Sequence, residues 1–138
     1  MYNEIRVFVE NKSGKLAKVA GALGNAGIDI INIELADEGQ FGVFKLLTAD
    51  PQKAKQALEN AGMTVAFNKV AVIEIADQPG SLVKLAKALE NEGMSVQDAY
   101  GCILDRGKRA IFVVKGDNLE AIESAAKGAG LKVLDSLE

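Results

Sequence analysis

Residues 9–28 read VENKSGKLAKVAGALGNAGI, and residues 75–94, which lie 66 positions later, read IADQPGSLVKLAKALENEGM. Eight of the fourteen positions from Gly14 to Gly27 are identical to their counterparts between Gly80 and Gly93. A repeat of this length exceeds the roughly 20–50 residues of a solenoid unit. The sequence therefore predicts a duplicated small domain, with boundaries near residues 1–67 and 68–138.

Each half predicts the order strand, helix, strand, strand, helix, strand. In the first half the strands are expected over 5–9, 28–35, 43–48 and 63–67, and in the second half over 70–75, 95–104, 110–115 and 131–134. Ser13 is placed as the N-cap of the first helix, and Asp50-Pro51 is a strong start for the second. Asp117 to Glu120 has the spacing of a capping box, which predicts the start of the last helix.

This order is typical of a ferredoxin-like sandwich, in which both helices cover one face of a four-stranded antiparallel sheet. The predicted fold class is therefore α+β, with two such sandwiches in tandem. Ile5, Val7 and Val9 are expected to face the helices. The opposite face also carries apolar residues such as Phe8 and Phe112, so we expect it to be covered, either between the two halves or between chains.

Composition excludes several classes of protein. The chain has 138 residues, a net charge of −3 and scattered basic residues, which argues against nucleic acid and anionic membranes as partners. It has no apolar run long enough to span a membrane and no signal peptide, and its single cysteine cannot form an internal disulfide. We therefore expect a cytoplasmic protein.

Catalytic and metal chemistry find little support in the residues. The chain has no histidine, which removes the commonest general base and metal ligand near neutral pH. Cys102, on a predicted strand, is interpreted as a small core or interface residue. Gly21, Gly24 and Gly27 form no nucleotide-binding loop, because two of them lie inside a predicted helix. They either provide a helix face that lets another element approach closely or are tolerated at a cost in helix stability. We expect no enzyme activity and no cofactor.

The loop before the first helix of each half is the best candidate site. The first loop (residues 11–16, NKSGKL) and the second loop (residues 77–82, DQPGSL) share a polar acceptor, a glycine three positions later and then a leucine. Free N–H groups at a helix start favour a carboxylate, and Asn11 or Asp77 can accept a hydrogen bond from an ammonium group. An α-amino acid carries both groups. Alternatively, Gly14 and Gly80 only shape a tight turn that Asn11 and Asp77 cap.

The pattern around these loops resembles the ACT domain, a small-molecule-binding regulatory module. The resemblance is clearest at Asp77–Leu82 and at residues 26–30, AGIDI, and two such units filling the chain are similar to the stand-alone ACT-domain pair. In that family an amino acid commonly binds between the first loop of one unit and the second strand of a neighbouring unit. The chain departs from the pattern at Ser13, where proline is usual, and at Ser95, where Asn or Asp is usual.

The resemblance implies ligand-binding residues in both halves. In the first half they are Asn11, Ser13, Gly14, Lys15, Leu16, Ile28 and Asp29, and in the second half Asp77, Pro79, Gly80, Ser81, Leu82, Met94 and Ser95. Each half keeps most of the pattern and lacks one part, so either both loops bind or one hybrid site forms.

The sequence and the resemblance favour a non-catalytic amino-acid-binding sensor or regulatory subunit. Its expected partners are an amino acid, a second unit of the same chain or a homodimer partner, and an enzyme that it regulates in trans. The alternative is a structural or interaction protein that keeps the fold for oligomerisation without binding a ligand.

Overall fold

The computed structural model describes residues 1–37 and 39–137, and the chain divides into two compact units. The first unit comprises Asn3–Asn68 together with Leu137, and the second comprises Lys69–Ser136 together with Met1 and Tyr2. The domain boundaries expected from the repeat stay a prediction about which segments fold independently.

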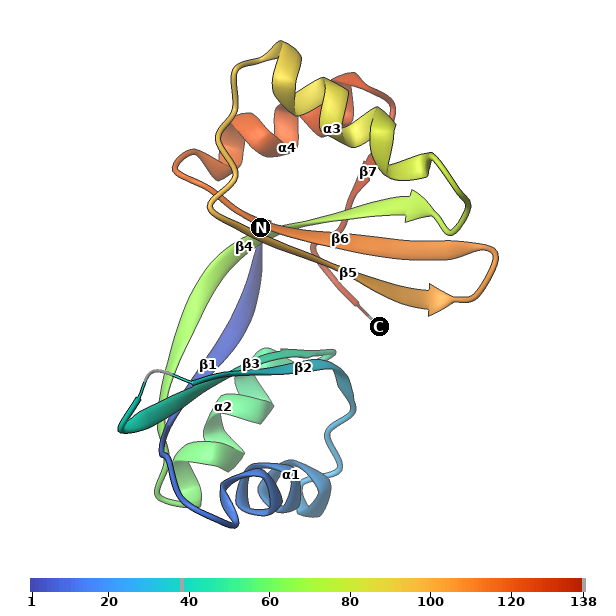
Figure 1. Ribbon diagram of the computed structural model, residues 1–138. Helices are drawn as coiled ribbons and strands as arrows, with labels where there is room; N and C mark the ends of the chain where they lie inside the picture. The colour runs from blue at the N-terminus through green and yellow to red at the C-terminus, as the bar shows by residue number, and fades with distance from the viewer. Residues whose placement is uncertain (38, 138) are drawn as a thin grey trace. The chain divides into compact units, whose positions relative to one another are not determined.

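The first unit contains a four-stranded arrangement and two helices. Its elements are β1 (Tyr2–Glu10), α1 (Lys15–Asn25), β2 (Ile30–Asp37), β3 (Phe41–Thr48), α2 (Pro51–Asn60) and the beginning of β4 (Thr64–Ala76). The strands follow the order β2-β3-β1-β4, and β3 pairs antiparallel with both β1 and β2. Helices α1 and α2 lie on one face of these strands (Figure 1).

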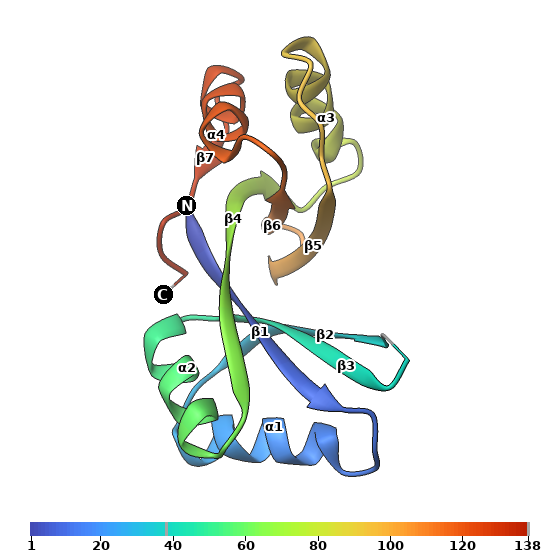
Figure 2. The same ribbon diagram turned by 90° about the vertical axis from the view of Figure 1, so that its left-hand side faces the viewer.

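The second unit repeats this arrangement. Its elements are the rest of β4, then α3 (Ser81–Asn91), β5 (Asp98–Asp105), β6 (Arg109–Lys115), α4 (Leu119–Gly128) and β7 (Lys132–Val133). The strand order is β5-β6-β4-β7, which is the order of the first unit with the corresponding strands. Helices α3 and α4 run side by side on one face (Figure 2). The predicted α+β fold with two ferredoxin-like sandwiches is confirmed.

The helix-facing side of each sheet forms a hydrophobic core. In the first unit the buried cluster consists of Ile5, Val7, Val19, Leu23, Phe44, Leu46, Ala54, Leu58 and Met63. In the second unit it consists of Ala71, Ile73, Leu85, Leu89, Val114, Ile122 and Ala126. Burial of each large aliphatic side chain stabilises the fold by about 1.5–3 kcal/mol. The helical spacing of these residues in the sequence therefore fixes which face of each helix meets its sheet.

Several element boundaries differ from the sequence expectation. The strands expected over 63–67 and 70–75 are one continuous strand, β4, because no glycine or proline interrupts the chain between them. The Asp50 side chain caps α2 by accepting from the Lys53 N–H at 3.1 Å, as predicted. The prediction of a capping box that begins at Asp117 is wrong, because Asn118 is the N-cap of α4 and its side chain accepts from the Ala121 N–H at 3.1 Å.

The strand expected over 95–104 begins only at Asp98. In the chain before it, the Ser95 carbonyl oxygen comes within 2.7 Å of the position that a Cβ would take at Gly116. Two residues later the Gln97 N–H donates to the Lys115 carbonyl at 2.8 Å, just before β5 begins. The last strand is also shorter than expected, since β7 comprises only Lys132–Val133.

Candidate functional site

Both candidate loops turn into their helices through a left-handed glycine. Gly14 is the N-cap of α1 with φ of 89°, and Gly80 is the N-cap of α3 with φ of 86°. Residues with a side chain rarely adopt this backbone conformation, which explains why both repeats have glycine here. The expectation that Ser13 caps α1 is therefore wrong, and neither helix has a side-chain cap.

Because no side chain caps α1 or α3 among the described residues, some backbone N–H groups at each helix start have no acceptor. In α1 the ladder begins with the Lys18 N–H donating to the Gly14 carbonyl at 3.0 Å. Among the described residues, the N–H groups of Lys15 and Leu16 before it donate to no acceptor, nor do those of Gly80 and Leu82 in the second unit. Such donors, together with the positive end of the helix dipole, attract a carboxylate or another anion.

Asn11 holds the first loop to the tip of the β2–β3 hairpin. Its N–H donates to the Gln40 carbonyl at 3.1 Å, and its side-chain Nδ2 donates to the Gly39 carbonyl at 2.9 Å and to Asp37 Oδ1 at 3.3 Å. Its Oδ1 accepts a hydrogen bond from Lys15 Nζ at 2.5 Å. Asn11 therefore does not cap α1, contrary to one of the two interpretations left open by the sequence.

Asp77 holds the second loop to its own hairpin in the same manner. The Asp77 N–H donates to the Lys108 carbonyl at 3.2 Å, and Asp77 Oδ2 accepts from the Gly107 N–H at 2.6 Å. Asp77 does not cap α3 either. Its other oxygen, Oδ1, accepts no hydrogen bond from the described part of the chain.

A cavity of about 440 Å³ adjoins the first loop. It is lined by the end of β1, the first turn of α1 and residues 62–64. Among the expected ligand-binding residues it brings together Ser13, Gly14 and Lys15. Lys12 and Lys18 add two further ammonium groups, and Glu10 adds one carboxylate. The lysines outnumber the glutamate, and the N–H groups at the start of α1 add partial positive charge, so the cavity suits an anionic group.

A second, more apolar groove of about 400 Å³ runs beside α3. It brings together Leu82 and Met94 from the set expected to bind ligand. The other lining residues are Leu85, Ala86, Leu89, Glu90, Val96 and Phe112. Pro79, Gly80 and Ser81 lie at the start of the same helix but do not line this groove. The groove suits an apolar side chain.

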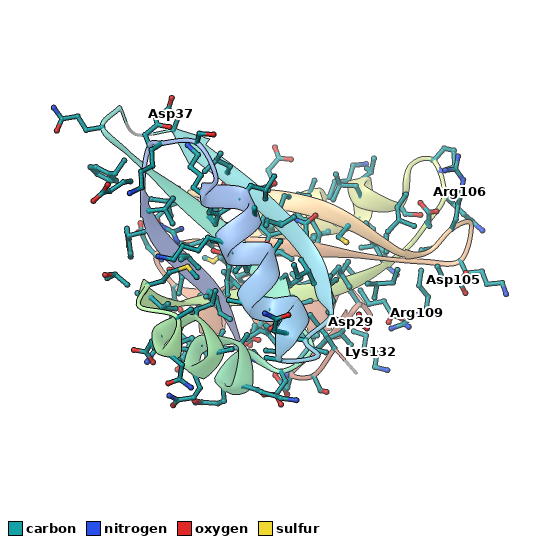
Figure 3. The ribbon with its side chains drawn as sticks, turned by 90° about the horizontal axis from the view of Figure 1, so that it is seen from below. Asp29, Asp37, Asp105, Arg106, Arg109 and Lys132 are labelled. Carbon is teal, nitrogen blue, oxygen red and sulfur yellow. The ribbon has the colours of Figure 1, made fainter. Side chains whose placement is uncertain are left out.

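The two halves of the expected site do not meet inside one unit. Ile28 and Asp29 lie between α1 and β2, beyond the C-terminal end of α1, whereas Gly14 lies at its N-terminal end. Figure 3 shows Asp29 and the hairpin residue Asp37 toward opposite ends of α1. Eleven helical residues span about 16 Å at 1.5 Å per residue, which exceeds the length of an amino acid. Met94 and Ser95 likewise follow the C-terminal end of α3.

The sequence reasoning missed the contribution of the hairpin tips. Gly39 and Gly107 bond the candidate loops through their backbone groups, which residue types alone do not reveal. The aspartate-x-glycine pattern at Asp37 and Asp105 predicts a turn in each hairpin but not its partner. The bond between Lys15 and Asn11 could have been suspected from their i, i+4 spacing across the loop.

The remaining candidates for chemistry are weak. Cys102 is a half-buried cysteine, and burial raises the pKa of its thiol, which lowers the fraction of reactive thiolate at neutral pH. The described residues contain no group of three His, Cys, Asp or Glu side chains able to hold a metal ion. No helix in the described part of the chain has both the length and the apolar composition to cross a membrane.

Comparison with known proteins identifies the architecture. The family described as the ACT domain pair matches residues 1–134, which confirms the resemblance. Protein BT0572 from Bacteroides thetaiotaomicron superposes with a TM-score of 0.87 at 26% sequence identity, covering 96% of this chain and 91% of that chain. The ligand-free regulatory subunit of aspartate kinase from Thermus thermophilus superposes with a TM-score of 0.63 at 19% identity, covering 92% and 91%. No curated protein matches the chain.

Proposed function

The chain belongs to the family of paired ACT domains, and we propose that it is a non-catalytic regulatory protein that binds an amino acid at one or both of the loops before α1 and α3. The arrangement of the second loop carries this proposal. The N–H groups of Gly80 and Leu82 at the start of α3 donate to no acceptor in the described part of the chain, and no described donor contacts Asp77 Oδ1, which lies three residues before Gly80 in the sequence. These groups match the carboxylate and the ammonium of an α-amino acid.

The apolar groove beside α3 supports the same proposal. Leu82 contributes to the groove and also provides one of the open N–H groups. An amino acid whose carboxylate binds at the helix start can therefore direct an apolar side chain toward Leu82. We propose that amino acids with apolar side chains bind more tightly than charged ones, because burying a charged group in this groove without a partner is costly.

Completion of the site requires a second unit. The residues expected from the family pattern lie at opposite ends of α1 and of α3, so one unit cannot supply all of them to one ligand. We propose that the loop of one unit faces the second strand of another, either in the same chain or in a homodimer. Ligand binding then changes how units associate, which provides a means of regulating an enzyme in trans in the cytoplasm.

A thermal-shift screen of the twenty proteinogenic L-amino acids tests the proposal. An amino acid present at 100 times its Kd should stabilise the folded protein by about 2.7 kcal/mol. A response to one or a few amino acids with apolar side chains supports the proposal. If none of the twenty changes the melting temperature at 10–20 mM, a range of roughly 100 times a Kd of 0.1–0.2 mM, amino-acid regulation is contradicted.

The second candidate is an interaction protein without a ligand. Exposed apolar side chains in the first unit favour it, since Leu16 on α1 and Ile33 and Leu35 on β2 are 57%, 36% and 45% exposed. Contiguous exposed apolar residues on an edge strand are typical of a protein-binding surface. A negative amino-acid screen combined with a stable oligomer in sedimentation analysis would favour this candidate.

A further inference from the structure

The two loops share a left-handed glycine at the helix start, but they differ in whether a side chain of the loop itself contacts the acceptor, Asn11 or Asp77. The repeat aligns Asn11 with Asp77 and Lys15 with Ser81. In the first loop Lys15 Nζ donates to Asn11 Oδ1 at 2.5 Å. In the second loop the hydroxyl of Ser81 carries no charge, and among the described residues no ammonium group contacts Asp77.

The sheet beside the loops differs in a matching way. Gly42 in β3 pairs with Val9, and Ala110 in β6 pairs with Ile75, which corresponds to Val9 in the repeat. Lys15 Nζ lies 3.7 Å from the position that a Cβ would take at Gly42. The lysine therefore lies over the strand at Gly42, at a distance that is ordinary van der Waals contact, whereas the second unit has the short Ser81 and an alanine, Ala110, at the position of Gly42.

We infer that Lys15 replaces the ammonium group of a ligand in the first loop, so that the protein itself closes this loop and only the second loop takes a free amino acid. The inference rests on the proposed function and deepens it by assigning the two loops different roles. The Lys15 ammonium occupies the acceptor oxygen that the ligand would need. Because it is tethered, its effective concentration at that oxygen is of millimolar order or higher.

Charge strengthens the difference between the loops. Asn11 is neutral. Lys18 lines the same cavity as Lys15, and Glu10, its one carboxylate, is paired with Lys12 at 3.4 Å, so a ligand ammonium entering there meets more cations than carboxylates. Asp77 offers a carboxylate, which forms an ion pair as well as a hydrogen bond with a ligand ammonium, whereas Asn11 offers only a neutral oxygen. An amino acid should therefore bind at the second loop and be rejected at the first.

Two reciprocal variants test the inference. Lys15→Ser gives the first loop the residue found in the second, and Ser81→Lys with Ala110→Gly gives the second loop the pair found in the first. Lys53→Ser is the control, since it removes one exposed positive charge from α2, a helix that contributes no residue to either loop. Each protein is titrated calorimetrically with the twenty proteinogenic L-amino acids in turn, and urea unfolding verifies that each variant is folded.

The expected result is one bound amino acid per parent chain, two per Lys15→Ser chain, and at least a tenfold weaker binding by the Ser81→Lys/Ala110→Gly variant. Two equivalents bound by the parent, or an unchanged single equivalent in the folded Lys15→Ser variant, would overturn the inference and leave the proposed function standing. Failure of both parent and Lys15→Ser to bind any of the twenty amino acids would overturn both. The control should bind as the parent does.

Discussion

Substitution of Asp77 separates its structural role from its proposed role in binding. Asp77→Ala removes the acceptor of the Gly107 N–H, 2.6 Å away, together with the oxygen proposed to accept from a ligand ammonium. Asp77→Asn keeps a carbonyl oxygen for Gly107 but removes the charge. In the first unit an asparagine, Asn11, occupies the corresponding position, although its side chain donates to the Gly39 carbonyl instead of accepting from the N–H. Comparison of the two variants therefore isolates the contribution of the charge.

The expected magnitudes follow from the hydrogen bonds involved. A hydrogen bond to a charged group contributes about 1.5–3 kcal/mol, so Asp77→Ala should weaken binding about 10- to 150-fold. Asp77→Asn keeps a hydrogen bond to the charged ammonium and removes only the ion pair, so it should weaken binding less than Asp77→Ala does. Asp77 is half-exposed and water can reach Gly107, so we expect either variant to lower the free energy of unfolding by about 1 kcal/mol or less.

Calorimetric titration with the amino acid that gives the largest thermal shift measures the binding loss, and urea unfolding measures stability. Asp105→Asn is a matched control, because it removes a carboxylate from the same hairpin that contacts only Lys108, at 3.9 Å, among the interactions described. It should bind like the parent. If Asp77→Ala also binds like the parent while remaining folded, Asp77 is only a tether for the hairpin, and the proposed ammonium contact is wrong.

Three further outcomes can be measured. Gly21→Ala and Gly24→Ala should each stabilise the protein by about 0.5–1 kcal/mol in urea unfolding, since an added Cβ at either position in α1 meets nothing within 4 Å; destabilisation would show that this face packs against a partner. Burial lowers the pKa of the Met1 ammonium, but its contacts with Glu123 and with Asp135 outweigh this, so the pKa is raised above 8.0. The stability that the ammonium contributes should be present below pH 8.0 and lost as pH rises through the raised pKa. Acetylation of the amine should abolish that pH dependence. Cys102 should react more slowly with a thiol reagent at pH 7 than a free cysteine does, because burial raises its pKa; equal rates would contradict this.

The fold could be predicted from the sequence because its determinants are local. Helical spacing at Leu16, Val19 and Leu23 and the glycines after each helix define the elements, and the 66-residue repeat shows that the set occurs twice. The N-cap of α1 was missed because serine has a strong intrinsic preference for that position. The loop requires a φ of 89°, which serine rarely adopts, so Gly14 takes the position.

The candidate site could be predicted only as far as local sequence reaches. The loops were found because glycine and leucine recur at the same spacing in both halves. The contacts of Asn11 and Asp77 depend on hairpin tips that lie 28 and 30 residues away along the chain. Their partners are backbone groups, so no residue type identifies them. The division of β4 into two strands was wrong because the repeat suggested a boundary where the backbone has none.

The positions at which the repeats differ indicate that the two loops have separated in role. Gly14 and Gly80 remain identical, as they must, because both helix starts need a left-handed residue. The positions proposed to meet a ligand's charged groups differ together between the repeats, with Asn11 and Lys15 in the first loop and Asp77 and Ser81 in the second. The Lys15 ammonium contacts the very oxygen that is proposed to accept from a ligand, and Ser81 has no such group. The contact of Lys15 with Asn11 is thus the proposed cause of closure of the first loop, and an amino-acid titration of the Lys15→Ser variant is the direct test.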